Sequence, residues 1–319
     1  MPDGKFRHEW GDAPHMQQGR TIMRYPVRTK TTAGFTLVEL LVVIAILAVL
    51  MGLVVAGVFK YMEKIPYTQT VNDLQQLTMA METFKAKYGV YPPSSIYLSN
   101  TLSDFTNTGN GASLAYLSAI WPRINSGFNA GVIDWSGGQG GIPAGGITLE
   151  GDQCLVFFLN GPGGANANGW SINPTNPTQT GGPRVGPFFE FPMDRLLPYP
   201  HPSTGQSAAV SAMFPSFWDR YSVPSISKGK PYAFFCSGRS AGGYGAHCPS
   251  LGVIPYVQSN GRFFNNNTCQ IISAGKDMNF GPGGAWPPSA ANGGNIPAYT
   301  GGAGVDDLSN FSGDMLGVF

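Results

Sequence analysis

A long apolar segment near the N-terminus constrains this chain more than any other feature. Residues 40–59 carry no charged side chain, and extending the segment back to Phe35 adds only Glu39. At about 1.5 Å rise per residue, such a helix spans roughly 30 Å, the thickness of a bilayer core. A buried helix rarely stays apolar on every face for this length, and a secretory signal peptide has a shorter apolar region. We therefore expect residues 35–60 to form a transmembrane helix.

Basic residues flank this segment on its N-terminal side. Residues 1–33 hold six Lys and Arg side chains against three Asp and Glu. The positive-inside rule places such a flank in the cytoplasm, so the rest of the chain is expected on the exported side. Over the whole sequence, 19 basic and 18 acidic residues leave a net charge of +1. This balance is unlike a nucleic-acid-binding surface, and no nucleic acid is expected as a direct partner.

Glu39 is the one ionisable side chain in the apolar segment. A carboxylate at the centre of a membrane span costs about 2.5–3.5 kcal/mol, less near an end, and usually has a partner. The alternative is an interfacial Glu at a helix start, where the helix dipole favours a negative charge. The sequence leaves both interpretations open.

The segment Lys30–Leu40, KTTAGFTLVEL, resembles the leader junction of type IV pilins and type II secretion pseudopilins. The resemblance rests on the basic flank, the Gly, the Phe-Thr-Leu-x-Glu pattern and the apolar run. It implies that residues 1–34 are a leader, cut after Gly34 by a prepilin peptidase. Phe35 would become an N-methylated N-terminus, and Glu39 would pair with the terminal amine of a neighbouring subunit during assembly.

This resemblance also implies partners and a location. The partners are like or related pilin subunits, the prepilin peptidase and the inner membrane, which the chain would cross once. The head would be exported to the periplasm or cell surface and would join a filament after assembly. The leader is longer than in many relatives, and translation starting at Met16 or Met23 is an alternative.

After the span, residues 61–89 are expected to form an amphipathic stalk helix. Its apolar residues recur at spacings of three and four, which indicates a helical stripe packed on a globular head: Val71, Leu74, Leu77, Met81 and Phe84. Proline removes a backbone donor and clashes with the preceding turn, so we expect a kink or short break at Ile65-Pro66.

Residues 90–319 are expected to form the head. The chain has 44 Gly and 26 Pro, and only 12% of its residues are charged, which predicts a loop-rich domain. Residues 152–159 form either a short helix capped by Asp152 or a buried strand, and we favour the helix. Extended segments are expected at 188–191, 232–236 and 269–273. The predicted fold class is α+β: a long N-terminal helix packed on a small antiparallel sheet. Three Gly/Pro-rich loops are expected on the surface: 137–146, 161–187 and 281–304.

Three head segments resemble the major pseudopilins more weakly. Residues 217–221, followed by 229–232, resemble their Asp-Pro-Trp-Gly-x-Pro-Tyr segment at the start of a strand. Residues 272–277 resemble their Ser-x-Gly-x-Asp-Gly loop, although Met278 replaces the usual Gly, and residues 306–311 resemble the acidic segment that closes the loop. In such relatives the loop binds calcium. The resemblance makes Ca²⁺ the one candidate cofactor, with these oxygen ligands: Asp277, Asn279, Asp306 and Asp307. Otherwise these acids are turn formers.

Four cysteines follow the membrane segment. An even number on the exported side favours disulfides, which persist in oxidising compartments. We expect Cys236 to pair with Cys248 and Cys154 with Cys269, although four cysteines allow three connectivities. Zinc binding is not expected, because there is no Cys-x-x-Cys spacing.

No catalytic motif is recognisable, and we do not expect an enzyme. His201 and His247 lie in Pro- and Gly-rich segments without a nearby nucleophile motif, and the Gly-rich segments lack the Lys-Ser/Thr of a phosphate-binding loop. The main functional hypothesis is a filament subunit, with a type II secretion pseudopilin favoured. The alternatives are a type IV pilus subunit for adhesion, motility or DNA uptake, and a membrane-anchored exported binding or surface protein.

Overall fold

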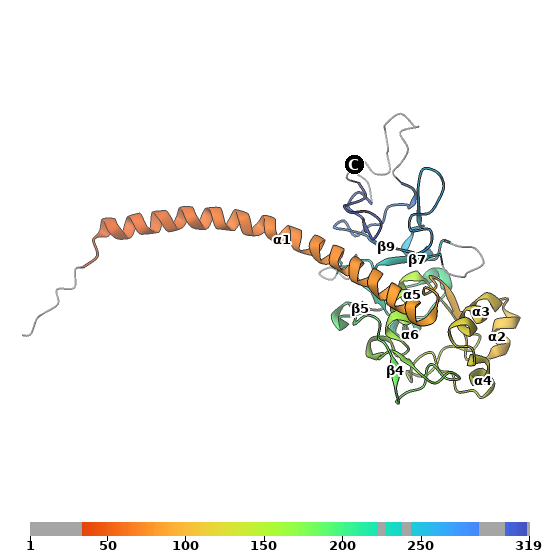
Figure 1. Cartoon of the computed structure of the whole chain (residues 1–319). Helices are drawn as coiled ribbons and strands as arrows, with labels where there is room; N and C mark the ends of the chain where they lie inside the picture. The colour runs from red at the N-terminus through yellow and green to blue at the C-terminus, as the bar shows by residue number, and fades with distance from the viewer. Residues whose placement is uncertain (1–33, 223–226, 238–243, 287–303, 318–319) are drawn as a thin grey trace, which may run out of the picture. The chain divides into compact units, whose positions relative to one another are not determined.

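A computed structural model describes residues 34–222, 227–237, 244–286 and 304–317 (Figure 1). The chain divides into two compact units, Met1–Ala56 and Gly57–Phe319, and each is described by itself. The predicted boundaries between leader, span, stalk and head stay predictions.

Helix α1 (Leu37–Tyr88) provides the described part of the first unit and the start of the second. It continues through Pro66, so a short break there is wrong, and the alternative of a kink stays a prediction. Proline removes one helical donor, but the next turns are stabilised by tertiary contacts, because Tyr67 and Val71 pack against the head core. In addition, the Thr68 hydroxyl donates to the Lys64 carbonyl at 3.2 Å.

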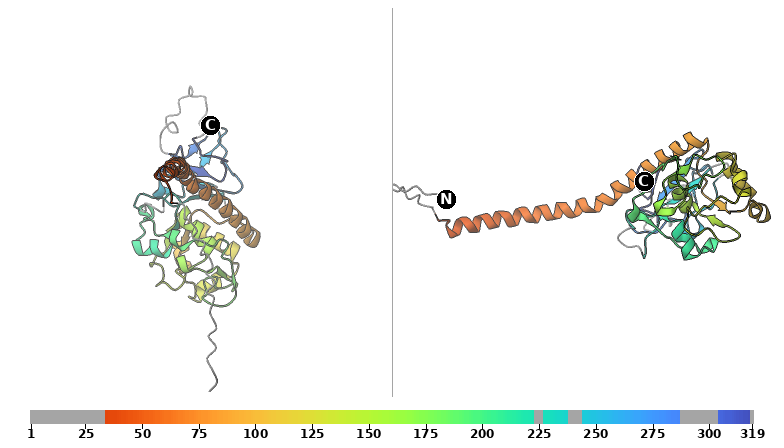
Figure 2. Two further views of the ribbon diagram at one scale, coloured as in Figure 1. Left: turned by 90° about the vertical axis from the view of Figure 1, so that its left-hand side faces the viewer. Right: turned by 90° about the horizontal axis from the view of Figure 1, so that it is seen from below.

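The second unit packs around the C-terminal half of α1, which lies along the head beside the central sheet (Figures 1 and 2). The predicted stripe is confirmed: Val71 is half-buried, and four residues are buried: Leu74, Leu77, Met81 and Phe84. The sheet has the order β11 (Leu308–Ser309), β9 (Cys269–Ser273) and β7 (Ala233–Cys236), with both pairs antiparallel. The strands expected near 232–236 and 269–273 are therefore confirmed, as is the α+β class.

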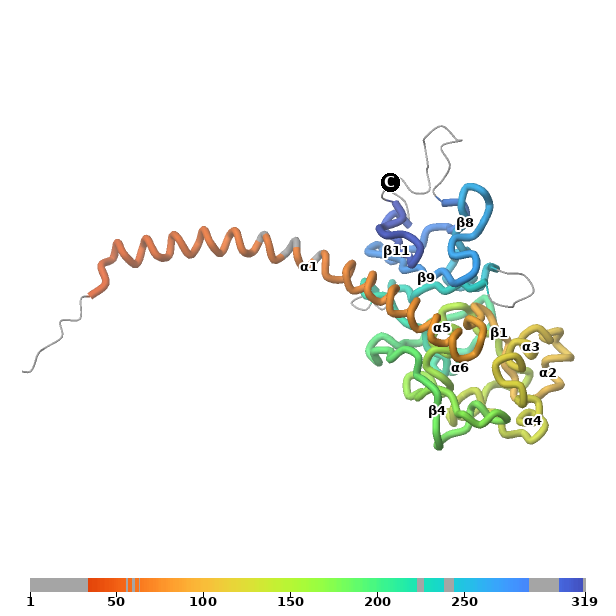
Figure 3. Tube along the Cα trace, in the orientation of Figure 1, coloured from red at the N-terminus to blue at the C-terminus, as the bar shows by residue number. Residues whose placement is uncertain are grey.

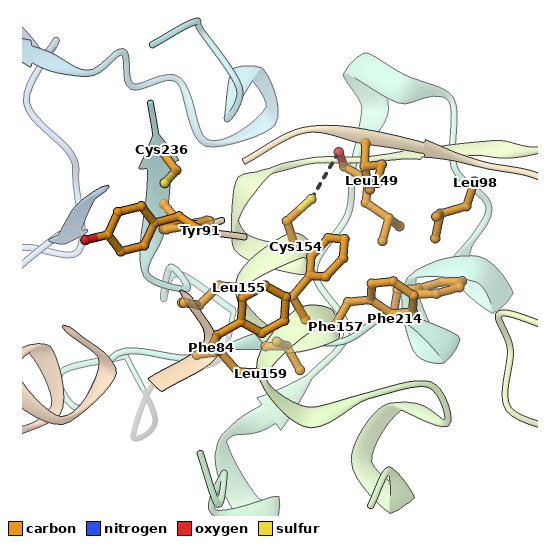
Figure 4. Packing of buried hydrophobic residues seen from close by; sticks show 14 of the residues in the cluster. Phe84, Tyr91, Leu98, Leu149, Cys154, Leu155, Phe157, Leu159, Phe214 and Cys236 are labelled. Atoms are coloured by element: carbon orange, nitrogen blue, oxygen red, sulfur yellow. Dashed lines mark hydrogen bonds between the residues drawn. The ribbon is translucent and has the colours of Figure 1, made fainter. Parts of the chain in front are cut away.

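Helix α5 (Gly151–Asn160) is the centre of the core, and every one of its residues is buried. Phe84 of α1 lies near α5 (Figure 4) and contacts Phe158 edge-on, with ring centroids 5.9 Å apart. The helix predicted here is confirmed, but its cap is Glu150 rather than Asp152. The Glu150 main-chain N–H donates to Gln153 Oε1 at 3.3 Å. Gly151 is needed because a side chain there would collide with the Phe234 carbonyl.

The remaining elements are short and are joined by loops. In Figure 3, β8, β9 and β11 lie together, apart from α2, α3 and α4. The other helices are α2 (Leu102–Asn107), α3 (Gly111–Ile120), α4 (Ile124–Asn129) and α6 (Ala208–Met213), with 3₁₀ turns η1 (Gly164–Asn166), η2 (Met193–Arg195), η3 (Pro202–Thr204) and η5 (Pro249–Leu251). The antiparallel pairs are β1 (Ile96–Leu98) with β2 (Ile147–Leu149), β3 (Trp170–Ser171) with β4 (Arg184–Val185), and β5 (Leu196–Leu197) with β6 (Ser216–Phe217). β8 (Tyr256–Val257) and β10 (Gly284–Ala285) pair in parallel.

One of the predicted surface loops contributes to the core. Trp170, within 161–187, is fully buried, and its indole N–H donates to the Phe158 carbonyl at 3.0 Å. Its ring lies 4.6 Å from that of Trp121, which in turn lies 6.1 Å from Trp135. The extended segment expected at 188–191 forms no strand. Most of the third loop, residues 287–303, lies outside the described residues.

A buried polar network joins α1 to the head. Arg195 Nη2 contacts Asp73 Oδ2 at 2.8 Å, and the Tyr232 hydroxyl donates to the same oxygen at 3.0 Å. Beside this pair, Asp219 is fully buried and accepts hydrogen bonds from the Thr70 and Ser273 hydroxyls and the Tyr221 N–H. Burial raises the pKa of Asp219 to about 6, although these hydrogen bonds favour its charged form.

Candidate functional site

The first turn of α1 brings Glu39 back onto the start of its own helix. The Thr36 N–H and hydroxyl both donate to Glu39 Oε2 at 2.9 Å, and the Glu39 N–H donates to Thr36 Oγ1 at 3.2 Å. This reciprocal pattern is the capping box expected for Thr-x-x-Glu at a helix start. The sequence carried that signal, but Thr36 was not singled out. Glu39 therefore lies at a helix start, as one of the two interpretations predicted. Its pairing with the terminal amine of a neighbouring subunit stays a prediction.

The predicted cleavage junction lies directly before the capping box. Gly34 and Phe35 are exposed and precede the helix in non-helical backbone. A Cβ added at Gly34 would meet no atom within 4 Å, and Phe35 is 79% exposed. The peptide bond between them is therefore accessible to an enzyme that binds an extended substrate.

The apolar segment after the junction is open on all sides within its own unit. Residues Leu37–Val55 form a helix that is long and apolar enough to cross a membrane, and none of that segment is buried. Its exposed side chains include Leu41, Ile46 and Leu53. Such a surface is stable only in lipid or against other apolar helices.

The residues of the predicted calcium loop come together in part. The Asp277 N–H donates to Asp306 Oδ2 at 2.8 Å, and Asp277 Oδ1 accepts from the Asn279 N–H at 2.7 Å. Gly275 has φ +64°, and a side chain there would collide with the Asp306 carbonyl. The loop at Asp277 and the acidic segment at Asp306 are thus neighbours. Their side chains offer oxygen atoms, the ligands that Ca²⁺ prefers.

Asp307, the fourth predicted ligand, has its own buried environment. Its Oδ2 accepts from the Gly281 N–H at 2.9 Å and from the Tyr256 hydroxyl at 3.2 Å, whereas Oδ1 is buried without a hydrogen bond. Burial raises the pKa of Asp307 to about 8. Asp307 Oδ1, which is buried and makes no hydrogen bond, is the oxygen that this carboxylate could offer a cation.

Both predicted disulfide pairings are wrong. The disulfide links Cys236 to Cys269, while Cys154 and Cys248 are free and buried. The cause is strand register: Cys236 of β7 lies directly opposite Cys269 of β9. The free thiols instead contact carbonyl oxygens, Cys154 that of Leu149 at 3.7 Å (Figure 4) and Cys248 that of Phe234 at 3.4 Å.

The other head segments singled out in the sequence lie side by side. Trp218 bridges Pro231, and the Tyr232 N–H donates to the Phe217 carbonyl at 2.9 Å. The two parts of the proposed pseudopilin-like segment therefore form one paired structure across their insertion.

A third polar cluster was not recognised from the sequence. Glu150, Asp152 and His201 are each no more than 2% exposed, and one ligand atom from each lies within 4.8 Å of the other two. His201 Nε2 lies 2.9 Å from Asp152 Oδ2. Burial opposes the charge on His201, but the hydrogen bond with Asp152 leaves the pKa raised; burial also raises the pKa of Glu150. No local spacing could reveal this cluster, because His201 is distant from the acids in the sequence.

Comparison with known proteins gives one match. A family model described as the prokaryotic N-terminal methylation motif matches residues 29–55. None of the curated proteins and none of the solved structures match the chain. The matched region covers the junction, the capping box and most of the apolar segment. It supports a type IV pilin-like subunit that is processed by prepilin peptidase, anchored in a membrane and exported.

Proposed function

We propose that this chain is a filament subunit of the type II secretion pseudopilin type, assembled through its N-terminal helix. The observation that carries the proposal is the matched motif at residues 29–55, which includes the unburied apolar segment Leu37–Val55 with Glu39 in its first turn. The head is proposed to be structural rather than enzymatic. The paired segment at 217–221 and 229–232 and the loop at 275–279 support the pseudopilin assignment.

Cleavage after Gly34 would create a cation one residue before Thr36. A carboxylate surrounded by lipid needs such a partner, because an unpaired buried charge is costly. Among the described residues, both Thr36 donors go to Glu39 Oε2, which leaves Oε1 open to a further donor. The capping box therefore holds Glu39 in place while one oxygen stays open to the amine of a neighbouring subunit.

Three substitutions separate charge pairing from helix capping. Glu39→Gln keeps a side chain that can complete the capping box but removes the charge; Thr36→Ala weakens the cap by about 1 kcal/mol but keeps the charge. Glu39→Ala removes both. If assembly depends on the charge, filament yield after shearing and pelleting falls for both Glu39 variants and stays near wild type for Thr36→Ala.

The opposite pattern would contradict the proposal. Filaments from Glu39→Gln at wild-type yield would limit Glu39 to helix capping, and normal function of Glu39→Ala cells would favour a simple membrane anchor. Processing is checked separately in each variant by mass spectrometry of the mature N-terminus.

Cleavage itself is tested at Gly34. Gly34→Val adds a branched side chain in open space, so the fold is expected to be unchanged. The side chain would, however, block the peptidase, which is expected to need glycine directly before the cleaved bond. The expected result is an uncleaved chain that stays in the membrane and out of filaments. A mature N-terminus at Phe35 in this variant would contradict cleavage that depends on Gly34.

Calcium at the loop of Asp277 and Asp306 belongs to the same proposal. Removing calcium is expected to lower the unfolding temperature of the wild-type chain and not that of Asp277→Asn. Equal shifts in both proteins would place the calcium effect elsewhere.

A further inference from the structure

Glu150, Asp152 and His201 come from two segments of the head, and hydroxyl groups from two further segments contact them. Glu150 and Asp152 begin α5, and His201 directly precedes η3. The Ser250 hydroxyl donates to Glu150 Oε1 at 2.6 Å, and the Ser216 hydroxyl donates to Asp152 Oδ2 at 2.6 Å. Each carboxylate is thus oriented by a hydroxyl from another segment.

The cluster has more acceptors than the protein satisfies. Asp152 Oδ1 is buried and makes no hydrogen bond. A buried polar atom without a partner is costly, and native proteins rarely leave one without a reason. An orphaned carboxylate oxygen beside an imidazole is a reason to look for a missing cation.

The charges give the same indication. Among the described residues, neither Glu150 nor Asp152 has a Lys or Arg ion-pair partner; the one ion-pair contact of the cluster joins Asp152 to His201 Nε2, and a metal ion would take its place. The N-terminus of α5 contributes about half a positive charge, too little for two carboxylates. A divalent cation bound by two carboxylates and a neutral imidazole would make the cluster neutral.

We propose that Glu150, Asp152 and His201 form a buried structural site for a divalent transition-metal ion, with Zn²⁺ the best match. Imidazole and carboxylate together favour zinc over calcium, which prefers oxygen ligands alone. Ligands at about 2.0 Å from a tetrahedral ion lie roughly 3.3 Å apart. The 2.9 Å between His201 Nε2 and Asp152 Oδ2 therefore needs only a small adjustment.

In this site Ser216 and Ser250 are positioning residues. Hydrogen bonds to ligating carboxylates commonly contribute 10–100-fold in metal affinity, so Ser250→Ala is expected to weaken zinc binding by about that factor. A merely structural Ser250 would change stability without changing zinc affinity in the folded chain.

The test uses the full chain in detergent, without an affinity tag that could bind metal. The protein is stripped with a chelator and dialysed against ZnCl₂ with excess Ca²⁺, which keeps the loop at Asp277 from contributing. We expect one Zn²⁺ per chain by mass spectrometry of the metal and a higher unfolding temperature. His201→Asn should lose the metal and the shift, whereas Asp194→Asn, which removes an exposed acid, should keep both.

X-ray absorption at the zinc edge of the wild-type chain keeps the test decisive if His201→Asn does not fold. Only nitrogen and oxygen neighbours, with one imidazole, are expected. The proposal is overturned if the wild-type chain neither retains zinc nor shifts its unfolding temperature, or if a folded His201→Asn chain retains zinc. It is also overturned if the absorption spectrum shows sulfur neighbours, which would place the ion on Cys154 or Cys248.

Discussion

Met278 occupies a backbone conformation that suits glycine. Its φ is +60°, in the left-handed region, and apart from Asn265 it is the only non-glycine residue with a positive φ in the described parts of the chain. Related loops were expected to carry Gly at this position. The sequence could flag the substitution, but only the structure shows that the unusual conformation is kept with a methionine in place.

Met278→Gly is expected to stabilise the protein. Relief of left-handed strain contributes about 1–2 kcal/mol, and the greater freedom of glycine in the unfolded chain offsets part of it, so the net gain is about 0.5–1 kcal/mol. Chemical denaturation of both proteins measures this. A loss of stability would show that the Met278 side chain contributes packing that outweighs the strain.

Asp219 makes stability depend on pH. Its pKa is raised to about 6 in the folded chain, against the ordinary value of 3.8 for an Asp side chain. The folded state therefore holds more protons than the unfolded state between these values, and stability falls as pH rises from about 4 to 6. The expected loss is about 2–3 kcal/mol. Arg195 opposes this shift and Asp73 adds to it.

Asp219→Asn should flatten this part of the profile. The unfolding free energy is measured at pH 4, 5, 6 and 7 for the wild type, Asp219→Asn and the exposed control Asp194→Asn. Parallel profiles for the wild type and Asp219→Asn would contradict a raised pKa at Asp219.

At the scale of elements, the disulfide fixes the register of the central sheet. Cys236 and Cys269 are partners on β7 and β9 and are 33 positions apart in the sequence. Replacing both by Ser is expected to lower the unfolding free energy by about 3–4 kcal/mol, the loop-entropy value for this separation. Thiol labelling of the unfolded, unreduced wild type should modify only Cys154 and Cys248. A mapped link between Cys236 and Cys248 would contradict the structure.

Sequence reasoning succeeded for elements with strong local signals. The apolar run predicted α1, the apolar spacing predicted four of its buried residues, and β9 was predicted with its observed bounds. It failed where the cause is non-local. Tertiary contacts let α1 continue through Pro66, and strand register chose the disulfide.

The candidate sites divide in the same way. Gly34, Phe35 and Glu39 were predicted because the motif is local, and their roles in processing and assembly stay predictions. The capping box follows a known pattern, although Thr36 was not singled out. The cluster of Glu150, Asp152 and His201 depends on chain folding that brings distant segments together. Only coordinates could reveal it.

At the scale of the whole molecule, the two units have different physical requirements. The first exposes an apolar helix and needs lipid or partner helices. The second buries its core, and its disulfide suits an oxidising compartment, which agrees with an exported head.

The head should fold without the membrane segment. A chain starting at Gly57 retains the whole second unit and omits Leu37–Val55, none of which is buried. We expect it to be soluble without detergent and to unfold cooperatively within a few degrees of the full chain. Aggregation, or a much lower unfolding temperature in calorimetry, would show that the omitted segment supports the head.

The packing of Trp121, Trp135 and Trp170 has a practical consequence for these experiments. Indole rings held 4.6 and 6.1 Å apart in a rigid core should give a strong circular dichroism signal in the near ultraviolet, which disappears when tertiary packing is lost. All three rings belong to the second unit, whereas the first turn of α1 belongs to the first. An unchanged spectrum for a Glu39 or Gly34 variant would therefore assign its defect to processing or assembly, with no antibody or partner protein required.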